Sequence, residues 1–151
     1  MTEQNLQILL RRRPTGMPVP DDFEIVETPI PTPGDGEVLI RHRYLSLDPY
    51  MRGRMDDAKS YSKPVELGAV MEGRCVGEVV ESRAAGFAPG DHVMMGYGWQ
   101  RYSCVPAAGL IRVDPADIKL SANVGLLGMP GLTAWVGLED IGTPKAGETV
   151  V

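Results

Sequence analysis

Apolar and polar side chains alternate with a period of two along several short stretches, which is the pattern of half-buried β-strands. The expected strands are residues 7–10, 23–27, 37–45, 92–95, 99–105 and 110–113, with a further strand pair over residues 73–81. Gly77 lies inside the last of these stretches, where it allows a strand to bend sharply. These strands suffice for a small barrel, so we expect a mainly β fold.

Glycine and proline separate these apolar runs. The chain has 18 glycines and 13 prolines, and they are spread between the expected strands rather than gathered in one tract. The step Pro89-Gly90-Asp91 predicts a type II turn, because proline presets φ and glycine accepts the positive φ that such a turn needs. This turn should lead into the strand that begins at His92.

The pattern changes after Pro115. Residues 121–128 and 132–139 space their apolar side chains as helices do, with Pro130 suited to the first turn and Gly142 to a left-handed cap. Residues 147–151 then read as a buried parallel strand, which normally opens a βαβ unit and needs neighbours on both sides. We therefore expect the chain to be part of a longer protein.

Size and charge exclude several classes of partner. With 151 residues, one domain is the expected organisation, and a net charge of -5 repels nucleic acid and anionic membrane surfaces. No apolar run approaches the roughly 20 residues of a membrane span, and the N-terminus lacks a signal core, so we expect a cytoplasmic protein. Cys75 and Cys104 are too few for a disulfide framework, and His42 and His92 have no partner spaced for a metal or a catalytic dyad.

Three separated runs carry a family resemblance. Residues 44–52 (YLSLDPYMR), 126–135 (LLGMPGLTAW) and 147–151 (GETVV) resemble the medium-chain dehydrogenase/reductase superfamily, and its prostaglandin/leukotriene reductase, curcumin reductase and plant double-bond reductase branch in particular. The resemblance implies a GroES-like, partly open β-barrel with appended helices over residues 1–146. It also implies that residues 147–151 begin a Rossmann domain whose phosphate turn follows the last residue.

The same resemblance bears on zinc. Zinc-dependent relatives place a cysteine after the first long strand and Gly-His-Glu before the glycine-rich one, whereas this chain has Asp48-Pro49-Tyr50 and Val70-Met71-Glu72 there. A thioether is a poor zinc ligand, so we expect no metal. Conjugate reduction stays feasible without a Lewis acid, because hydrogen-bond donors stabilise the enolate that hydride addition creates.

Four residues are candidates for binding substrate. By resemblance Tyr50 faces the substrate carbonyl and donates a hydrogen bond to the enolate oxygen; the alternative is a tyrosine that caps a buried turn. Tyr97 and Trp99, in a glycine-flanked loop, suit a wall against an apolar ligand, although an aromatic ring there would also plug one end of the barrel. Glu72 could orient substrate or a ribose hydroxyl, or form a salt bridge.

Two residues are candidates for cofactor contact. The segment that holds Met129 and Thr133 resembles the place where the family's catalytic domain meets the nicotinamide. Thr133 would bond the carboxamide or cap its helix, and Met129 would pack on the ring or fill the core. Arg52 and Arg54 could attract an acidic substrate or a cofactor phosphate, but we interpret both as solvated surface residues.

The resemblance therefore implies the N-terminal domain of an NADPH-dependent enone or enal reductase, which acts by hydride transfer without zinc on a small-molecule substrate. Two alternatives remain open: a quinone oxidoreductase of the same superfamily, and a GroES-like binding module without enzymatic activity. NADPH would be bound mostly by the second domain, so residues 1–151 alone should neither bind it measurably nor reduce enones. The full-length protein could form a homodimer.

Overall fold

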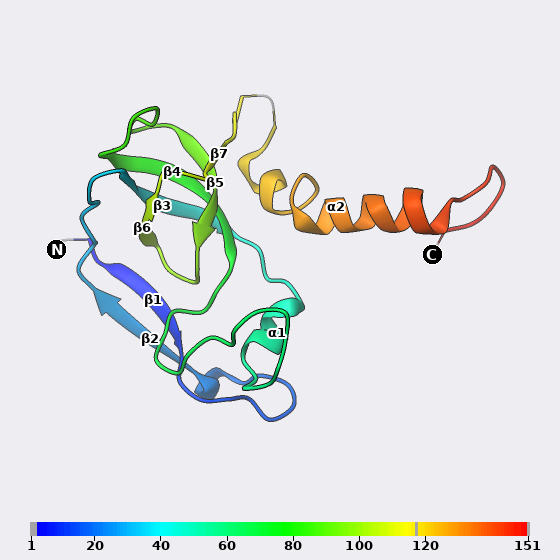
Figure 1. Cartoon of the computed structure of the whole chain (residues 1–151), viewed down its shortest axis with the longest axis horizontal. Helices are drawn as coiled ribbons and strands as arrows, with labels where there is room; N and C mark the ends of the chain where they lie inside the picture. The colour runs from blue at the N-terminus through cyan, green and yellow to red at the C-terminus, as the bar shows by residue number, and fades with distance from the viewer. Residues whose placement is uncertain (1–2, 117, 151) are drawn as a thin grey trace.

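Two antiparallel β-sheets form the body of the molecule in the computed structural model, which describes residues 3–116 and 118–150 (Figure 1). The smaller sheet pairs β1 (Asn5–Leu10) with β2 (Phe23–Thr28). The larger sheet has the strand order β6 (Tyr102–Pro106), β3 (Glu37–Leu45), β4 (Arg74–Ser82), β5 (His92–Tyr97) and β7 (Ile111–Arg112). The helical segments are η1 (Pro20–Asp22), α1 (Tyr50–Arg54), η2 (Leu120–Val124), α2 (Met129–Val136) and η3 (Gly137–Gly142). The predicted mainly β, GroES-like fold is confirmed; η2, α2 and η3 follow the strands as expected, whereas η1 and α1 lie between strands.

Strand β1 links the two sheets into a partly open barrel. Its backbone bonds to two segments of the larger half, with Ile8 N–H donating to Trp99 O at 2.8 Å and Met71 N–H donating to Ile8 O at 2.9 Å. At the other end of β1, the buried Asn5 side chain accepts from Tyr102 N–H at 2.9 Å and donates to Tyr102 O at 3.0 Å. These bonds satisfy backbone groups that a two-stranded sheet by itself would leave unpaired.

The apolar core has two clusters. The first lies on the five-stranded sheet and consists of Val38, Ile40, Val79, Val93 and Val105. The second joins β1 to α1 and to the segment before β4, and it consists of Leu10, Met55, Val65 and Met71. Because the second cluster holds α1 against β1, it fixes where the side chains of α1 can point.

The strand pair predicted over residues 73–81 is wrong, because β4 is one continuous strand that pairs with β3 on one side and β5 on the other. Gly77 lies close to the backbone of β3: a Cβ there would lie 2.3 Å from Arg41 O. The pairing of β3 with β4 is also irregular between His42 and Tyr44, close to this point. Only glycine allows the two backbones to approach this closely.

The predicted type II turn is confirmed. Gly90 has a φ of 95°, and Asp91 N–H donates to Ala88 O at 3.1 Å across the turn. The turn delivers the chain into β5 at His92, as expected.

The C-terminal segment departs from the predictions in three ways. The helix expected over residues 121–128 is the short 3₁₀ turn η2, and the left-handed position after the next helix is Thr143, with a φ of 43°, rather than Gly142. Residues 147–150 form a turn and then irregular chain instead of a strand, because no described strand lies beside them to supply ladder hydrogen bonds. The last residue of that prediction, Val151, lies outside the described residues.

Helix α2 and its continuation η3 project from the barrel (Figure 1). Neither has a buried residue. Within the described ranges, no helix is long and apolar enough to cross a membrane.

Candidate functional site

A pocket of about 390 Å³ lies where α1, the segment before β4 and the end of β5 meet. The side chains that matter for its chemistry are Tyr50, Arg54, Glu72, Arg74 and Met95. They come from segments far apart in the sequence. The pairing of β4 with β5 and the second core cluster bring these segments together.

Tyr50 is the first residue of α1 and lies on the pocket wall. Pro49 precedes it with a φ of -57°, which is preset for a helix start, and Met51 N–H donates to Asp48 O at 3.1 Å. Tyr50 is 37% exposed, so its side chain is not sealed in a buried turn. Partial burial, followed by the charges of Asp48 and Glu72, raises the pKa of Tyr50 above its usual value. The phenol therefore stays protonated, and able to donate, throughout the neutral range.

Glu72 is held by Arg54 in a two-bond ion pair. Arg54 Nε and Nη2 donate to the two carboxylate oxygens of Glu72 at 2.8 and 2.5 Å. The prediction that Arg54 is a solvated surface residue is wrong, since only 7% of it is exposed, and the hydrogen bond to Glu72 raises its pKa. Glu72 forms the salt bridge that was its alternative role, while its side chain stays 44% exposed on the pocket wall.

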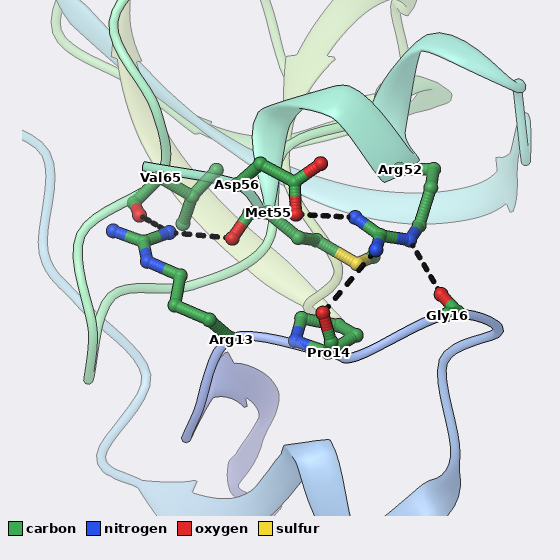
Figure 2. A network of polar contacts seen from close by, with 7 residues as sticks. All are labelled: Arg13, Pro14, Gly16, Arg52, Met55, Asp56 and Val65. Carbon is green, nitrogen blue, oxygen red and sulfur yellow. Dashed lines mark hydrogen bonds and ion pairs between the residues drawn. The ribbon is translucent and has the colours of Figure 1, made fainter. Parts of the chain in front are cut away.

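A second arginine network fastens α1 to the loop that follows β1 (Figure 2). Arg52 donates to two carbonyl oxygens of this loop at 2.9 and 3.2 Å and pairs with Asp56 at 2.6 Å. Arg13, from the loop itself, donates to two carbonyl oxygens beyond α1 at 2.9 and 2.6 Å. The acceptor carbonyls belong to Gly16, Pro14, Met55 and Val65. Arg52 therefore holds α1 against this loop, and the prediction that it is a solvated surface residue is wrong.

Trp99 packs beside the pocket without lining it. Its ring stacks on Phe23, with centroids 5.5 Å apart and planes at 25°, and it covers the second core cluster. This is the arrangement of an aromatic ring that closes one end of the barrel. The prediction for Tyr97 concerns a side chain outside the described residues; its backbone pairs with Arg74 at the end of β5.

Met129 and Thr133 lie one helical turn apart on α2, and both are exposed. Thr133 sits inside the helix, whose N-cap is Gly128, and Met129 is 41% exposed, so neither the cap nor the core-filling alternative describes them. Their spacing places a thioether and a hydroxyl on one helix face, which fits contact with a flat amide-bearing ring. The structure does not bring them into the Tyr50 pocket.

The two positions compared with zinc ligands hold Tyr50 and a fully buried Met71. Among residues 3–116 and 118–150, no three histidine, cysteine or acidic side chains gather closely enough to hold a metal ion. Burial raises the pKa of the nearby Cys75 thiol to about 12, so this sulfur stays protonated.

Arg74 and Met95 are among the pocket residues that the sequence analysis did not predict. Nothing in the strand pattern distinguishes Arg74 from other strand arginines. The run Met94-Met95 does interrupt the alternation of β5, and the structure has an irregular step at this point, opposite Cys75 and Val76. This interruption is the feature of the sequence that could have pointed to Met95.

Comparison with known proteins then identifies the fold's family. Residues 6–113 match the family model described as the N-terminal domain of oxidoreductase. The chain belongs to this family. The oxidoreductase domain is 48% identical, over 149 residues, to an NADPH-dependent curcumin reductase of Escherichia coli, and these residues cover 99% of this chain and 43% of that protein. It is 38% identical to a 2-alkenal reductase (NADP(+)-dependent) of Nicotiana tabacum (97% of this chain, 44% of the relative) and 39% identical to prostaglandin reductase 1 of Bos taurus (94% and 42%).

A solved structure agrees with these relatives. The oxidoreductase domain superposes on CurA of Vibrio vulnificus in complex with NADPH with a TM-score of 0.86, at 46% identity, over 95% of this chain and 42% of that one. The resemblance to the curcumin, alkenal and prostaglandin reductase branch is confirmed. The chain spans less than half the length of each of these relatives.

Proposed function

We propose that this chain is the substrate-side domain of an NADPH-dependent reductase that reduces the activated C=C bond of enones and enals without zinc. Residues 1–146 form this domain, and residues 147–151 lead into the nucleotide-binding domain. The observation that carries the proposal is a protonated tyrosine, Tyr50, on the wall of a partly apolar pocket. The names of the curcumin, 2-alkenal and prostaglandin reductases support the reaction class.

Bound NADPH would supply the hydride that adds to the β-carbon of the substrate. Tyr50 donates a hydrogen bond to the substrate carbonyl oxygen, which gains negative charge as the enolate forms. A donor already fixed toward that oxygen stabilises the charge without reorganising, and α1 is fixed on both sides by the arginine network and the second core cluster. The Arg54 cation offsets the Glu72 charge, which would otherwise oppose the negative charge of an enolate in this pocket.

The structure supports the other predicted substrate and cofactor contacts to different degrees. Glu72 lines the pocket and can meet substrate with the part of its side chain that remains exposed. Trp99 stacks on Phe23 and packs on the second core cluster, whose Met71 lines the pocket, and Tyr97 remains a predicted wall residue. Met129 and Thr133 are proposed to contact the nicotinamide, because both are exposed on one face of α2. The proposed full-length enzyme is cytoplasmic, acts on a small molecule and forms a homodimer.

The test compares Tyr50→Phe with the wild-type full-length protein, with NADPH oxidation followed in the presence of an enal. Losing the donor should lower kcat/KM by about 10²-fold or more, as for other oxyanion donors. Tyr61→Phe is the matched control, because Tyr61 is a neighbouring tyrosine that is 85% exposed. Unchanged turnover in the Tyr50 variant would contradict the assigned role.

The alternatives are separated by two further measurements. Activity on quinones but not on enals would favour the quinone oxidoreductase. Dinucleotide binding by residues 1–151 alone, measured by calorimetry, should be undetectable. If the full-length protein reduces neither enals nor quinones, the result would favour the binding module without enzymatic activity.

A further inference from the structure

The arginines around the pocket differ in whether an acidic side chain forms an ion pair with them. Arg54 is neutralised by Glu72, and Arg52 is neutralised by Asp56 and bound to two carbonyls. Arg74, the first residue of β4, also lines the pocket and is half-buried. No carboxylate of the described residues lies within ion-pair distance of it. Of the two arginines that line the pocket, Arg74 is thus the one that forms no ion pair with a described carboxylate.

Among the described residues, the Arg74 side chain makes one hydrogen bond, and its acceptor is weak. Its Nη1 donates to the Met95 thioether sulfur at 3.6 Å. An arginine fork has five N–H groups and matches a carboxylate with two parallel bonds, so most of this donor set is available to a ligand. A partly enclosed pocket strengthens such a bond relative to open water.

Met95, which accepts this hydrogen bond, has an unusual backbone conformation. Met95 has a φ of 93°, a conformation that bulky side chains rarely adopt. It is the extra residue of a β-bulge, since Cys75 pairs with Gly96 while Val76 pairs with Met94. The bulge leaves Met95 on the pocket wall, and a soft, uncharged sulfur therefore stands beside Arg74. Such strained positions persist mainly at functional sites.

We propose that Arg74 is a specificity-determining residue that binds a carboxylate carried by the enone substrate, while Tyr50 binds the carbonyl oxygen of the same molecule. The inference rests on the proposed function and names its substrate class, which is enones with an anionic tail. Both residues line one pocket of about 390 Å³, which lies in the range of small-molecule sites. An anion at this position could also be a cofactor phosphate, so the test separates the two sources.

The experiment uses the full-length protein and a pair of substrates that differ in one charge: a straight-chain enone with a terminal carboxylate, and its methyl ester. The wild type should prefer the acid by about tenfold or more in kcat/KM, which is the effect expected of one charge-assisted hydrogen-bond pair. Arg74→Gln should abolish this preference, so that the acid and the ester are reduced with similar kcat/KM. Arg74→Lys should keep part of the preference, and added salt should narrow it in the wild type.

The matched control is Arg83→Gln. Arg83 is an exposed arginine just after β4 that does not line the pocket, and its substitution should leave the acid-to-ester ratio unchanged. A wild-type ratio near one, or a preference that survives Arg74→Gln, would overturn the proposal. So would a rise in the KM for NADPH with no change in the ratio, because the anion would then be the cofactor's phosphate.

A binding measurement keeps this result distinct from the proposed function. Calorimetry with the saturated keto acid, which cannot be reduced, should show weaker binding to Arg74→Gln than to wild type by about tenfold. If the wild type reduces neither acid nor ester, the proposed reaction is contradicted, and the calorimetric comparison still decides whether Arg74 binds the carboxylate. Equal binding to both proteins would refute its role.

Discussion

His42, on β3, should make the stability of this domain depend on mild acid. His42 is half-buried, its Nε2 lies 2.8 Å from Ser103 Oγ, and its buried Nδ1 has no partner among the described residues. Burial lowers the pKa of His42 from 6.5 to about 4. The folded protein therefore holds this ring neutral at a pH where the unfolded chain protonates it.

The sign and size of the effect follow from proton linkage. Between pH 6.5 and pH 4 the unfolded chain binds more protons than the folded one, so the free energy of unfolding falls as the pH falls. Each pH unit between the two pKa values is worth about 1.4 kcal/mol. Acidification from pH 7.5 to pH 5 crosses about one and a half of these units, so the His42 contribution to this loss is about 2 kcal/mol.

The assay is urea unfolding at pH 7.5 and at pH 5, followed by tryptophan fluorescence, on wild type and on His42→Gln. Glutamine can keep a hydrogen bond to Ser103 but does not titrate, so the variant should lose about 2 kcal/mol less than the wild type on acidification. Carboxylates titrate in both proteins and cancel in this difference. His92→Gln, which leaves His42 in place, is the matched control. Equal losses in wild type and His42→Gln would refute the reasoning.

Two further substitutions test the barrel. Gly77→Ala should destabilise the fold by about 1–3 kcal/mol, because its Cβ would lie 2.3 Å from Arg41 O, whereas Gly53→Ala on α1, with open space around it, should be neutral or stabilising by up to about 1 kcal/mol in the same denaturation assay. Asn5→Ala should cost about 2–3 kcal/mol and increase hydrogen exchange at the Tyr102 amide, because it leaves both buried backbone groups of Tyr102 without the partners that Asn5 supplies. An unchanged unfolding midpoint for Gly77→Ala, or unchanged exchange at Tyr102 in the Asn5 variant, would show that these contacts do not hold the barrel closed.

Much of the fold could be predicted because its signals are local. The alternation over residues 37–45 matches β3, and the Pro89-Gly90 step matches its turn, since side-chain period and φ preference are properties of neighbouring residues. The motif around Tyr50 also led to the correct family and to a residue that lines the pocket. The strand predicted over residues 147–151 does not form over residues 147–150 of this chain, because a parallel strand depends on partners, which an apolar run cannot itself supply.

The sequence by itself determined most of the strands, the turn at Pro89-Gly90 and the family, whereas only the tertiary structure decided the electrostatics of the pocket. Three arginines, at positions 52, 54 and 74, look alike along the chain. Their roles differ because Asp56 and Glu72 pair with the first two, while the third donates to a thioether and pairs with no carboxylate among the described residues. Glu72 lies 18 residues from Arg54 and on another segment, so their pairing depends on how β1, α1 and β4 pack together. Which charge remains free to bind a ligand is therefore a property of the packed barrel, because ion pairing requires proximity in space and sequence patterns report only proximity along the chain.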